Sequence, residues 1–189
     1  MKVVLPEFGE CEVSFEPMAN SVHRRLQEEY LILLEAAQKS PKSALAEVEK
    51  FYQAHSDYPE IANLMSFVYL RVEKIKEAEA LILASYEKYP AYFFAKINYA
   101  DQCLRKDRAL EIPKIFSGYS FANRMHHYSE IRGFAVVMGF YHLGLQDKGK
   151  AEEFYRLALE LDPQHASVVL LRKKIFKTSF LKKILARYF

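Results

Sequence analysis

The sequence predicts an all-α protein made of antiparallel helical pairs, preceded by a short extended segment. The chain has 189 residues, 51% of them apolar and 14% aromatic, which is the composition of a folded domain with a sizeable core. Its six glycines and seven prolines are few and fall between apolar segments of helical periodicity. In addition, residues 65–90 and 138–163 match each other at a constant offset of 73 positions. Short connections between helices, together with a recurring helical pair, explain these features.

The internal repeat preserves the size of the residue at each position. The same order of residue types recurs in both copies: large apolar, small, ring, small, large apolar, small, proline. The matching pairs are Met65 and Met138, Ser66 and Gly139, Tyr69 and His142, Ala78 and Ala151, Ile82 and Tyr155, Ser85 and Ala158, and Pro90 and Pro163. Small residues are expected where two helices cross closely, and large residues fill the space beside the crossing. Each proline ends a helical pair, because it cannot donate a hydrogen bond to the helix before it.

This order of residues resembles the tetratricopeptide repeat (TPR), whose period is about 34 residues. The offset of 73 then equals two periods plus about five inserted residues. The sequence Glu160-Leu161-Asp162-Pro163 is the closest local likeness to the family. The chain departs from the family in having no tryptophan, since Ala62 and Ala135 stand at the usual aromatic position. The resemblance covers residues 59–92 and 132–165 best, and it implies a right-handed αα-hairpin solenoid of about three to four helical pairs.

Residues 1–20 are predicted to form an extended N-terminal segment. Apolar residues alternate with polar neighbours on both sides of the turn-like sequence Phe8-Gly9-Glu10. The alternating apolar residues are Val3, Leu5, Cys11, Val13 and Phe15. This period of two is typical of β-strands, so we expect a β-ribbon. A two-stranded ribbon is marginal alone, and it must pack on the helices, pair with another chain or stay loosely ordered.

Residues 21–165 form the predicted TPR-like repeat domain. A degenerate first pair covers residues 22–58, with a helix capped by Asn20 or Ser21 and a second helix started by Pro41. The pairs at 59–92 and 132–165 are more regular. Between them, Pro113 and the breaker cluster at residues 116–120 predict only a short helix near 107–117, followed by an irregular link to about residue 127. We expect the five inserted residues in that link.

Residues 166–189 are predicted to form a basic C-terminal capping helix with a break near residues 178–179. Val168, Leu171 and Ile175 share one helical face, and Ser179 can cap a second, amphipathic helix. That helix would place its apolar residues opposite its charges. The apolar residues are Phe180, Leu181, Ile184, Leu185, Tyr188 and Phe189, and the charged ones are Lys182, Lys183 and Arg187.

The formal net charge of +3 combines two opposite contributions. Seven basic residues and no acidic residue follow Asp162, whereas residues 1–162 hold 20 basic and 24 acidic residues. The body is therefore mildly acidic, and the basic segment is where an electrostatic partner should be sought. The segment is interpreted first as a solvated cap of the solenoid and next as a contact with an anionic membrane surface. Nucleic acid is the least favoured partner, because binding it requires no apolar face.

Motifs that would indicate an enzyme or a cofactor are absent from the sequence. We find no glycine-rich phosphate loop, no HExxH, no paired CxxC and no nucleophile elbow, so we expect no catalysis, cofactor or metal. His126 and His127 are expected to be exposed or to cap a helix, and Cys103 to be a small core residue. If these residues and Glu130 surrounded one pocket, they would be the first sign of a catalytic site. Two cysteines and the absence of a signal-like or membrane-spanning segment predict a cytoplasmic protein.

The predicted function is noncatalytic binding of a protein or peptide, as an adaptor or a chaperone-like module. The TPR resemblance implies that the first helix of each pair lines a concave groove. The matching residues are Asn63, Phe67, Leu70, Arg71, Ile97, Asp101, Leu104, Arg105, Val136, Phe140 and Leu143. Such a mixture suits a segment held by apolar anchors, with Phe67 and Phe140 contributing to binding more than to stability.

Two alternatives to an open groove remain. Residues 1–20 or 179–189 could fill the groove, in which case its apolar residues are internal packing. The chain could instead be a peripheral membrane protein anchored by the amphipathic helix at 179–189, which liposome flotation with and without that helix would reveal. In length and repeat number the chain also resembles the secretion chaperones of bacterial injection systems. Those are commonly acidic, unlike the C-terminal segment of this chain.

Overall fold

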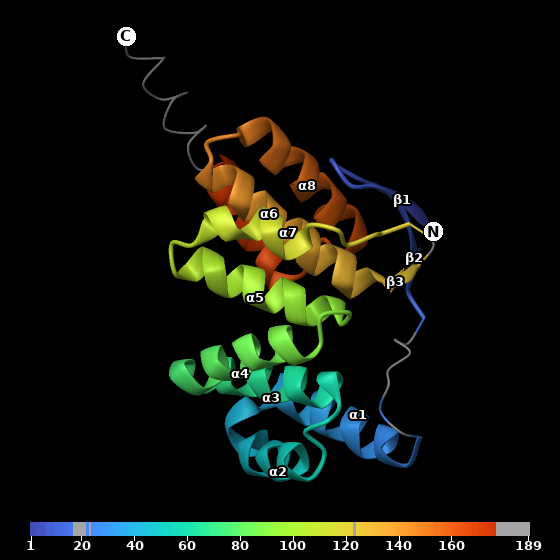
Figure 1. Cartoon of the computed structure of the whole chain (residues 1–189), viewed down its shortest axis with the longest axis vertical. Coiled ribbons are helices and arrows are strands. Elements are labelled where there is room, and N and C mark those ends of the chain that lie inside the picture. The colour runs from blue at the N-terminus through green and yellow to red at the C-terminus, as the bar shows by residue number, and fades with distance from the viewer. Residues whose placement is uncertain (17–21, 23, 123, 177–189) are drawn as a thin grey trace. The chain divides into compact units, whose positions relative to one another are not determined.

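The computed structural model describes residues 1–16, 22, 24–122 and 124–176. These residues are mostly helical, with one small sheet (Figure 1). The chain divides into two compact units. We call Ala19–Gln102 the central unit, and Met1–Met18 together with Cys103–Phe189 the terminal unit.

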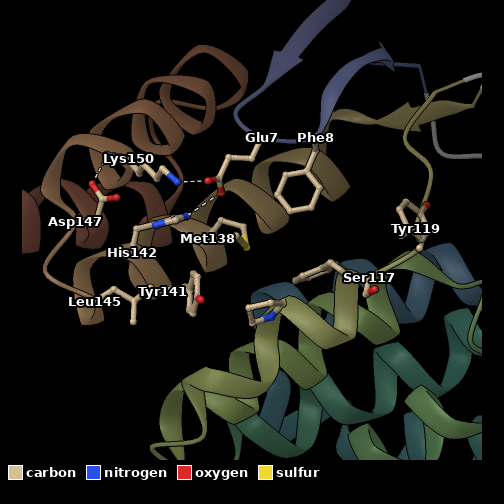
Figure 2. A pocket seen from close by; sticks show the side chains of 13 residues that line it. Glu7, Phe8, Ser117, Tyr119, Met138, Tyr141, His142, Leu145, Asp147 and Lys150 are labelled. Atoms are coloured by element: carbon tan, nitrogen blue, oxygen red, sulfur yellow. Dashed lines mark hydrogen bonds and ion pairs between the residues drawn. The ribbon is translucent and has the colours of Figure 1, made fainter.

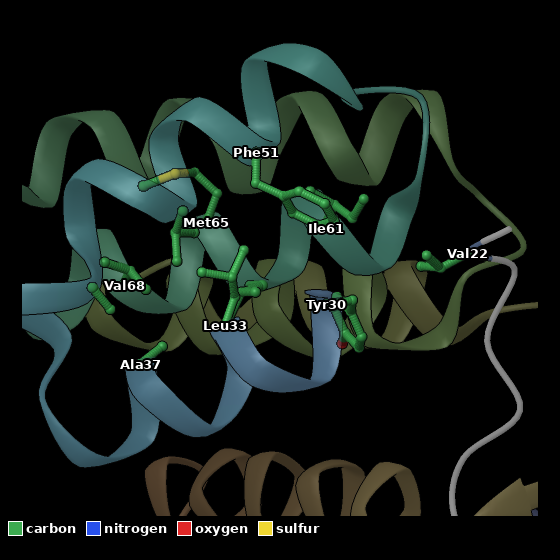
Figure 3. Close-up of a cluster of buried hydrophobic side chains, with 11 residues drawn as sticks. Val22, Tyr30, Leu33, Ala37, Phe51, Ile61, Met65 and Val68 are labelled. Carbon is green, nitrogen blue, oxygen red and sulfur yellow. The ribbon is translucent and has the colours of Figure 1, made fainter. Parts of the chain in front are cut away.

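The central unit contains α1 (Arg24–Lys39), α2 (Pro41–Ala54), α3 (Pro59–Arg71), α4 (Ile75–Lys88) and most of α5 (Phe93–Arg105). Prolines begin both α2 and α3, where the missing N–H would have no partner in the helix. The apolar faces of α1, α2 and α3 meet in one core (Figure 3). The buried residues of this core are Val22, Tyr30, Leu33, Ala37, Ala44, Val48, Phe51, Ile61, Leu64, Met65 and Val68.

The terminal unit combines a three-stranded sheet with helices. The strands β1 (Lys2–Leu5) and β2 (Gly9–Ser14) form an antiparallel hairpin, and β3 (Met125–His127) pairs in parallel with β2. The helices are η1 (Ala109–Glu111), α6 (Ile112–Phe116), α7 (Tyr128–Gly144), α8 (Lys148–Leu161) and a helical segment over residues 166–176. The inward residues Val3, Leu5, Cys11 and Val13 are buried, and the sheet packs on α7 and α8.

Strand β3 corrects the expectation of a wholly irregular link to residue 127. The strand has only three residues, so its sequence carries no alternating pattern long enough to predict it. It forms because β2 is paired with β1 on one side only and offers its other edge to β3, where Glu12 stands opposite Met125 and Val13 opposite His126.

The turns between helices follow the repeat period. The second helices begin at residues 41, 75, 109 and 148, at intervals of 34, 34 and 39. Glu73, Asp107 and Gln146 occupy the same place in the last three turns, and each has a left-handed backbone with φ of 65°, 57° and 62°. In each case the next backbone N–H bonds back to the carbonyl five positions earlier, at 2.8–2.9 Å. The five extra residues therefore lie between residues 109 and 148, in agreement with the predicted insertion.

The small residues of the repeat are buried as the helix-crossing argument requires. Ala78, Ala151 and Ala158 have no exposed surface, nor has Ala100, which stands one period of 34 residues after Ser66, and Gly139 is also buried. A Cβ atom on Gly139 would lie 2.6 Å from Cδ2 of Leu171, in the helical segment 166–176. That segment therefore lies directly against α7.

The C-terminal face predicted up to residue 175 is buried at Val168, Leu171 and Ile175. The predicted break near 178–179 and the basic amphipathic helix at 179–189 lie outside the described residues, as do the caps Asn20 and Ser21. Within the described ranges, the helices are too short or too polar to cross a lipid bilayer.

Candidate functional site

The partner-binding residues predicted from the sequence lie on α3, α5 and α7 and differ in accessibility. Arg71 and Arg105 are exposed, whereas Ile97 and Val136 are buried. The partly buried members are Asn63, Phe67, Leu70, Asp101, Leu104, Phe140 and Leu143. The central unit contains α3 and most of α5, whereas α7 belongs to the terminal unit. The predicted surface is therefore considered one unit at a time.

Within the central unit, two of the predicted residues have internal partners. The side-chain oxygen of Asn63 accepts a 2.6 Å hydrogen bond from the amide of Asn98, which joins α3 to α5. The ring of Phe67 packs against the core shared by α1, α2 and α3. Apolar residues on the first helix thus serve the interior of the unit as well as its surface.

Phe67→Ala is therefore expected to lower the free energy of unfolding by about 1–3 kcal/mol, less than for a fully buried ring. Chemical denaturation followed by circular dichroism measures this loss. An unchanged midpoint would mean that the ring contributes little to the core, and would favour the binding role predicted from the sequence.

The terminal unit holds a cavity of about 540 Å³ (Figure 2). Its walls come from the β1–β2 turn, from α6 and the loop after it, from α7 and from the start of α8. The lining residues are Glu7 and Phe8; Pro113, Phe116, Ser117, Gly118 and Tyr119; Met138, Tyr141, His142 and Leu145; and Asp147 and Lys150.

Two different faces of α7 carry the cavity and the predicted groove residues. Met138, Tyr141, His142 and Leu145 follow the i, i+3, i+4, i+7 spacing of one helical face. Val136, Phe140 and Leu143 follow the i, i+4, i+7 spacing of another. Sequence reasoning did not find the cavity face. The one feature of the sequence that could have indicated this face was His142, a titratable ring at the position that Tyr69 occupies in the other copy of the repeat.

A cluster of phenylalanines forms the apolar wall of the cavity and the core behind it. Phe134 lies at its centre and is fully buried. The ring centroids of Phe8, Phe116 and Phe121 lie 4.9–5.1 Å from that of Phe134, and the centroid of Phe154 lies at 6.0 Å. Phe8 comes from the hairpin turn, so the aromatic cluster fixes this turn to the helices.

The turn places Glu7 at the polar end of the cavity. The N–H of Phe8 donates to the carbonyl of Leu5 at 3.0 Å, and both Glu7 and Gly9 have positive φ, at 69° and 83°. A non-glycine residue pays a steric penalty in this left-handed region. In this conformation the Glu7 carboxylate reaches α7 and α8, as Figure 2 shows.

The Glu7 carboxylate lies between a lysine and a histidine. The Lys150 Nζ donates to Oε1 of Glu7, and this hydrogen bond is the main reason why the pKa of Lys150 is raised. Oε2 of Glu7 lies 3.4 Å from Nε2 of His142, which is within ion-pair range if the ring is protonated. Asp147 accepts a 3.1 Å hydrogen bond from the backbone N–H of Lys150, and so caps α8.

His142 is a buried polar side chain at the same end of the cavity. It is 4% exposed, and its ring stacks on Phe154 at 5.5 Å. Neither ring nitrogen has a hydrogen-bond partner among the described residues, because Nε2 approaches Glu7 only as a 3.4 Å ion-pair contact that does not have the geometry of a hydrogen bond. Most buried polar groups in proteins do have a partner. This unsatisfied ring therefore marks the polar end of the cavity as a candidate binding site.

The two histidines of the inserted link differ: His127 caps a helix and His126 is buried. His127 caps α7: its Nδ1 accepts from the N–H of Ser129 at 3.4 Å, while Glu130 accepts from the N–H of His127 at 3.0 Å. His126 is 3% exposed, which corrects the expectation of an exposed or capping residue. It points inward because alternate residues of β3 face opposite sides of the sheet.

The other residues that would have suggested a catalytic or metal site are Cys103, His126 and Glu130. Cys103 is buried, and Nδ1 of His126 lies 3.7 Å from a carboxylate oxygen of Glu130. Among the residues that the structure describes, no three or more His, Cys, Asp or Glu side chains are grouped so that they could hold a metal ion.

Histidine capping predicts a pH-dependent stability in the terminal unit. His165 caps the segment 166–176 as His127 caps α7, with the N–H of Ser167 donating to its Nδ1 at 3.3 Å. Burial lowers the pKa of both rings below the ordinary 6.5, and Arg132 lowers it further, while Glu130 beside His127 and Asp162 beside His165 partly oppose the decrease. The unfolded chain then binds more protons, so stability is complete above about pH 6.5 and falls as pH decreases below it.

Replacing both His127 and His165 by asparagine is expected to flatten this dependence, because asparagine caps a helix without titrating. Urea unfolding between pH 7 and pH 5.5 compares the double variant with the wild type. Equal slopes in the two proteins would contradict the assignment to these caps.

Comparison with known proteins gives a similarity to a solved structure but none to a described family. No protein-family model and no curated protein match the sequence. Among solved structures, the chain is similar to MamA, described as "MamA RS-1 ArsTM double mutant", with a TM-score of 0.50 and 14% sequence identity. The match covers 86% of this chain and 98% of MamA, which is a TPR-like protein. This similarity is one of fold alone. It supports a TPR-like, mostly helical fold, as the turn spacing does.

Proposed function

We propose that this chain is a noncatalytic protein-interaction module, of the adaptor or chaperone-like kind, that binds a segment of a partner protein. One side chain of that segment inserts into the cavity of the terminal unit. The TPR-like fold is consistent with a protein-interaction module in general. The observation that carries the proposal is the cavity itself, with its aromatic wall and its polar end.

The size and lining of the cavity suit an anchoring side chain. Ligand sites usually enclose about 300–1,000 Å³ and combine apolar walls with a few polar groups. Here about 540 Å³ is bordered by aromatic rings, by Met138 and by the charged residues of the turn and of α8. A partner side chain that enters this open pocket would exchange part of its water for contacts with these rings, as the residues that dominate binding energy commonly do.

The repeat architecture provides the surface along which the rest of the segment would lie. We infer that the helical pairs stack as a right-handed solenoid, on the basis of the 34-residue intervals and the recurring left-handed turns. Within the terminal unit, the partly buried residues Phe140 and Leu143 and the exposed Arg105 are then secondary contacts.

Peptide selection on the whole chain tests this function and does not require the partner to be identified first. Random peptides displayed on phage are selected against the purified protein, and the dissociation constants of the best binders are measured. Ser117→Trp should block the cavity, because Ser117 is exposed and lines it. Ser120→Trp is the matched control, since Ser120 is exposed in the same loop but does not line the cavity.

The expected result is peptides whose binding is lost in Ser117→Trp and kept in Ser120→Trp. Binding that is lost only in Phe140→Ala would favour the first-helix surface predicted from the sequence and exclude the cavity. Repeated failure to select any specific peptide would contradict the interaction module.

A further inference from the structure

The two oxygens of the Glu7 carboxylate are in different situations. Oε1 accepts the hydrogen bond from Lys150, whereas Oε2 makes no hydrogen bond to any described residue. Oε2 lies at the cavity, 3.4 Å from Nε2 of His142 (Figure 2). An acceptor with spare capacity and an unsatisfied ring nitrogen therefore lie side by side.

The charges around this point favour a neutral group. Lys150 is already paired with Glu7, and Asp147 is used at the first turn of α8. A ligand carboxylate would meet these two acidic side chains, and a ligand ammonium would compete with Lys150 for the same carboxylate. A neutral hydroxyl avoids both costs, since it can donate to Oε2 and accept from Nε2–H.

The rest of the cavity favours an aromatic ring. Phe8, Phe116, Tyr119 and Tyr141 contribute rings to the lining, and Met138 contributes a thioether. Aromatic rings pack well edge-on or offset against other rings, and sulfur makes favourable contacts with ring edges. A tyrosine meets both requirements. A phenylalanine lacks the hydroxyl, and a tryptophan N–H can donate but cannot accept.

The geometry points to a tyrosine-binding site: the cavity takes a tyrosine side chain of the partner segment, whose hydroxyl donates to Glu7 Oε2 and lies next to His142 Nε2. This inference rests on the proposed function, because it names the partner residue that enters the cavity. It also gives the buried His142 ring the hydrogen-bond partner that it lacks among the described residues.

Two small probes test the site on the full chain. 4-Methylphenol has the ring and hydroxyl of tyrosine, and 4-methylanisole has the same ring with the O–H donor replaced by a methyl ether. Both are titrated into ¹³C-labelled protein, and the ring resonances of Phe8 and His142 are followed by NMR. A hydrogen bond to a carboxylate predicts that 4-methylphenol binds about tenfold more tightly.

Variants then separate the hydroxyl from the ring. His142→Phe keeps the stacking on Phe154 but removes Nε2, and Glu7→Gln removes the charge of the acceptor. Glu7→Gln is expected to reduce the preference for 4-methylphenol to less than about threefold, whereas His142→Phe, which removes a donor that the oxygen of either probe can accept from, is expected to weaken both probes. Ser117→Trp should abolish binding of both probes, and Ser120→Trp should leave it unchanged. In the selected peptides, Tyr→Phe should weaken binding by the same factor as the loss of the probe's hydroxyl.

Equal affinities for the two probes would overturn the tyrosine inference, as would a preference that survives unchanged in Glu7→Gln. If Ser117→Trp still abolished binding in that case, an apolar anchor would remain and the proposed function would stand. Binding of neither probe at millimolar concentration would overturn the inference as well, and the peptide selection would then decide the proposed function separately.

Discussion

Phe134→Ala is expected to lower the free energy of unfolding of the terminal unit by about 3–5 kcal/mol, the usual range for removing a buried phenylalanine. The ring is fully buried and lies among those of Phe8, Phe116, Phe121 and Phe154. Alanine would remove the contacts with all four and leave a cavity that several aromatic neighbours cannot close. Urea unfolding and hydrogen exchange of α7 and α8 would measure the loss.

Phe15→Ala provides the matched control for this prediction. Phe15 also belongs to the terminal unit and stacks on Tyr128 at 5.0 Å, but it is 54% exposed. Its loss is expected to cost less than about 1 kcal/mol, because little of its surface leaves water on folding. Similar losses in the two variants would contradict the central position of Phe134.

Gly139→Leu should destabilise the terminal unit by about 1–3 kcal/mol through overpacking. Even a Cβ atom at this position would lie 2.6 Å from Leu171 Cδ2 and 3.2 Å from its Cδ1. Leu171 is fully buried, so it cannot simply rotate into solvent. The segment 166–176 must therefore move away from α7, and its amides should exchange faster. Thermal unfolding and hydrogen exchange together would detect both effects.

Gly144→Ala, at the other end of the same helix, controls for the general effect of replacing a glycine. No described atom lies within 4 Å of a Cβ atom at Gly144, which ends α7. Alanine there is expected to be neutral or to stabilise by up to about 1 kcal/mol, because it restricts the unfolded chain. If Gly139→Leu were equally harmless, the repeat alignment at this crossing would be wrong.

The helical pairs were predictable because their determinants are local in sequence. Helix periodicity, the prolines that begin α2 and α3 and the small residues at crossings act within one pair of helices or between neighbouring helices of the repeat. The repeat offset of 73 was visible for the same reason: Ala78 and Ala151 each meet the same steric demand. None of these features depends on a contact between distant parts of the chain.

The cavity and the third strand depend on contacts between residues far apart in the chain. Glu7 meets Lys150 and His142 only because the hairpin packs on α7 and α8, and nothing in the sequence near residue 7 indicates this. For the predicted first-helix surface, the sequence pattern is visible but has two explanations. Phe67 has the spacing of a groove residue, yet the same spacing allows it to pack on the core. Periodicity identifies an apolar face but does not say what covers it.

The discontinuity of the terminal unit has a consequence for biosynthesis. Glu12 pairs with Met125, so β2 must wait until more than a hundred further residues have been synthesised before it gains its second neighbour. The central unit is continuous in sequence and has no such delay. A nascent chain that stalls before Met125 would carry a folded centre beside a hairpin whose β2 edge is unpaired. Such an edge can pair with strands of other chains, so ribosome-bound intermediates of this length should be the most aggregation-prone species that the protein passes through.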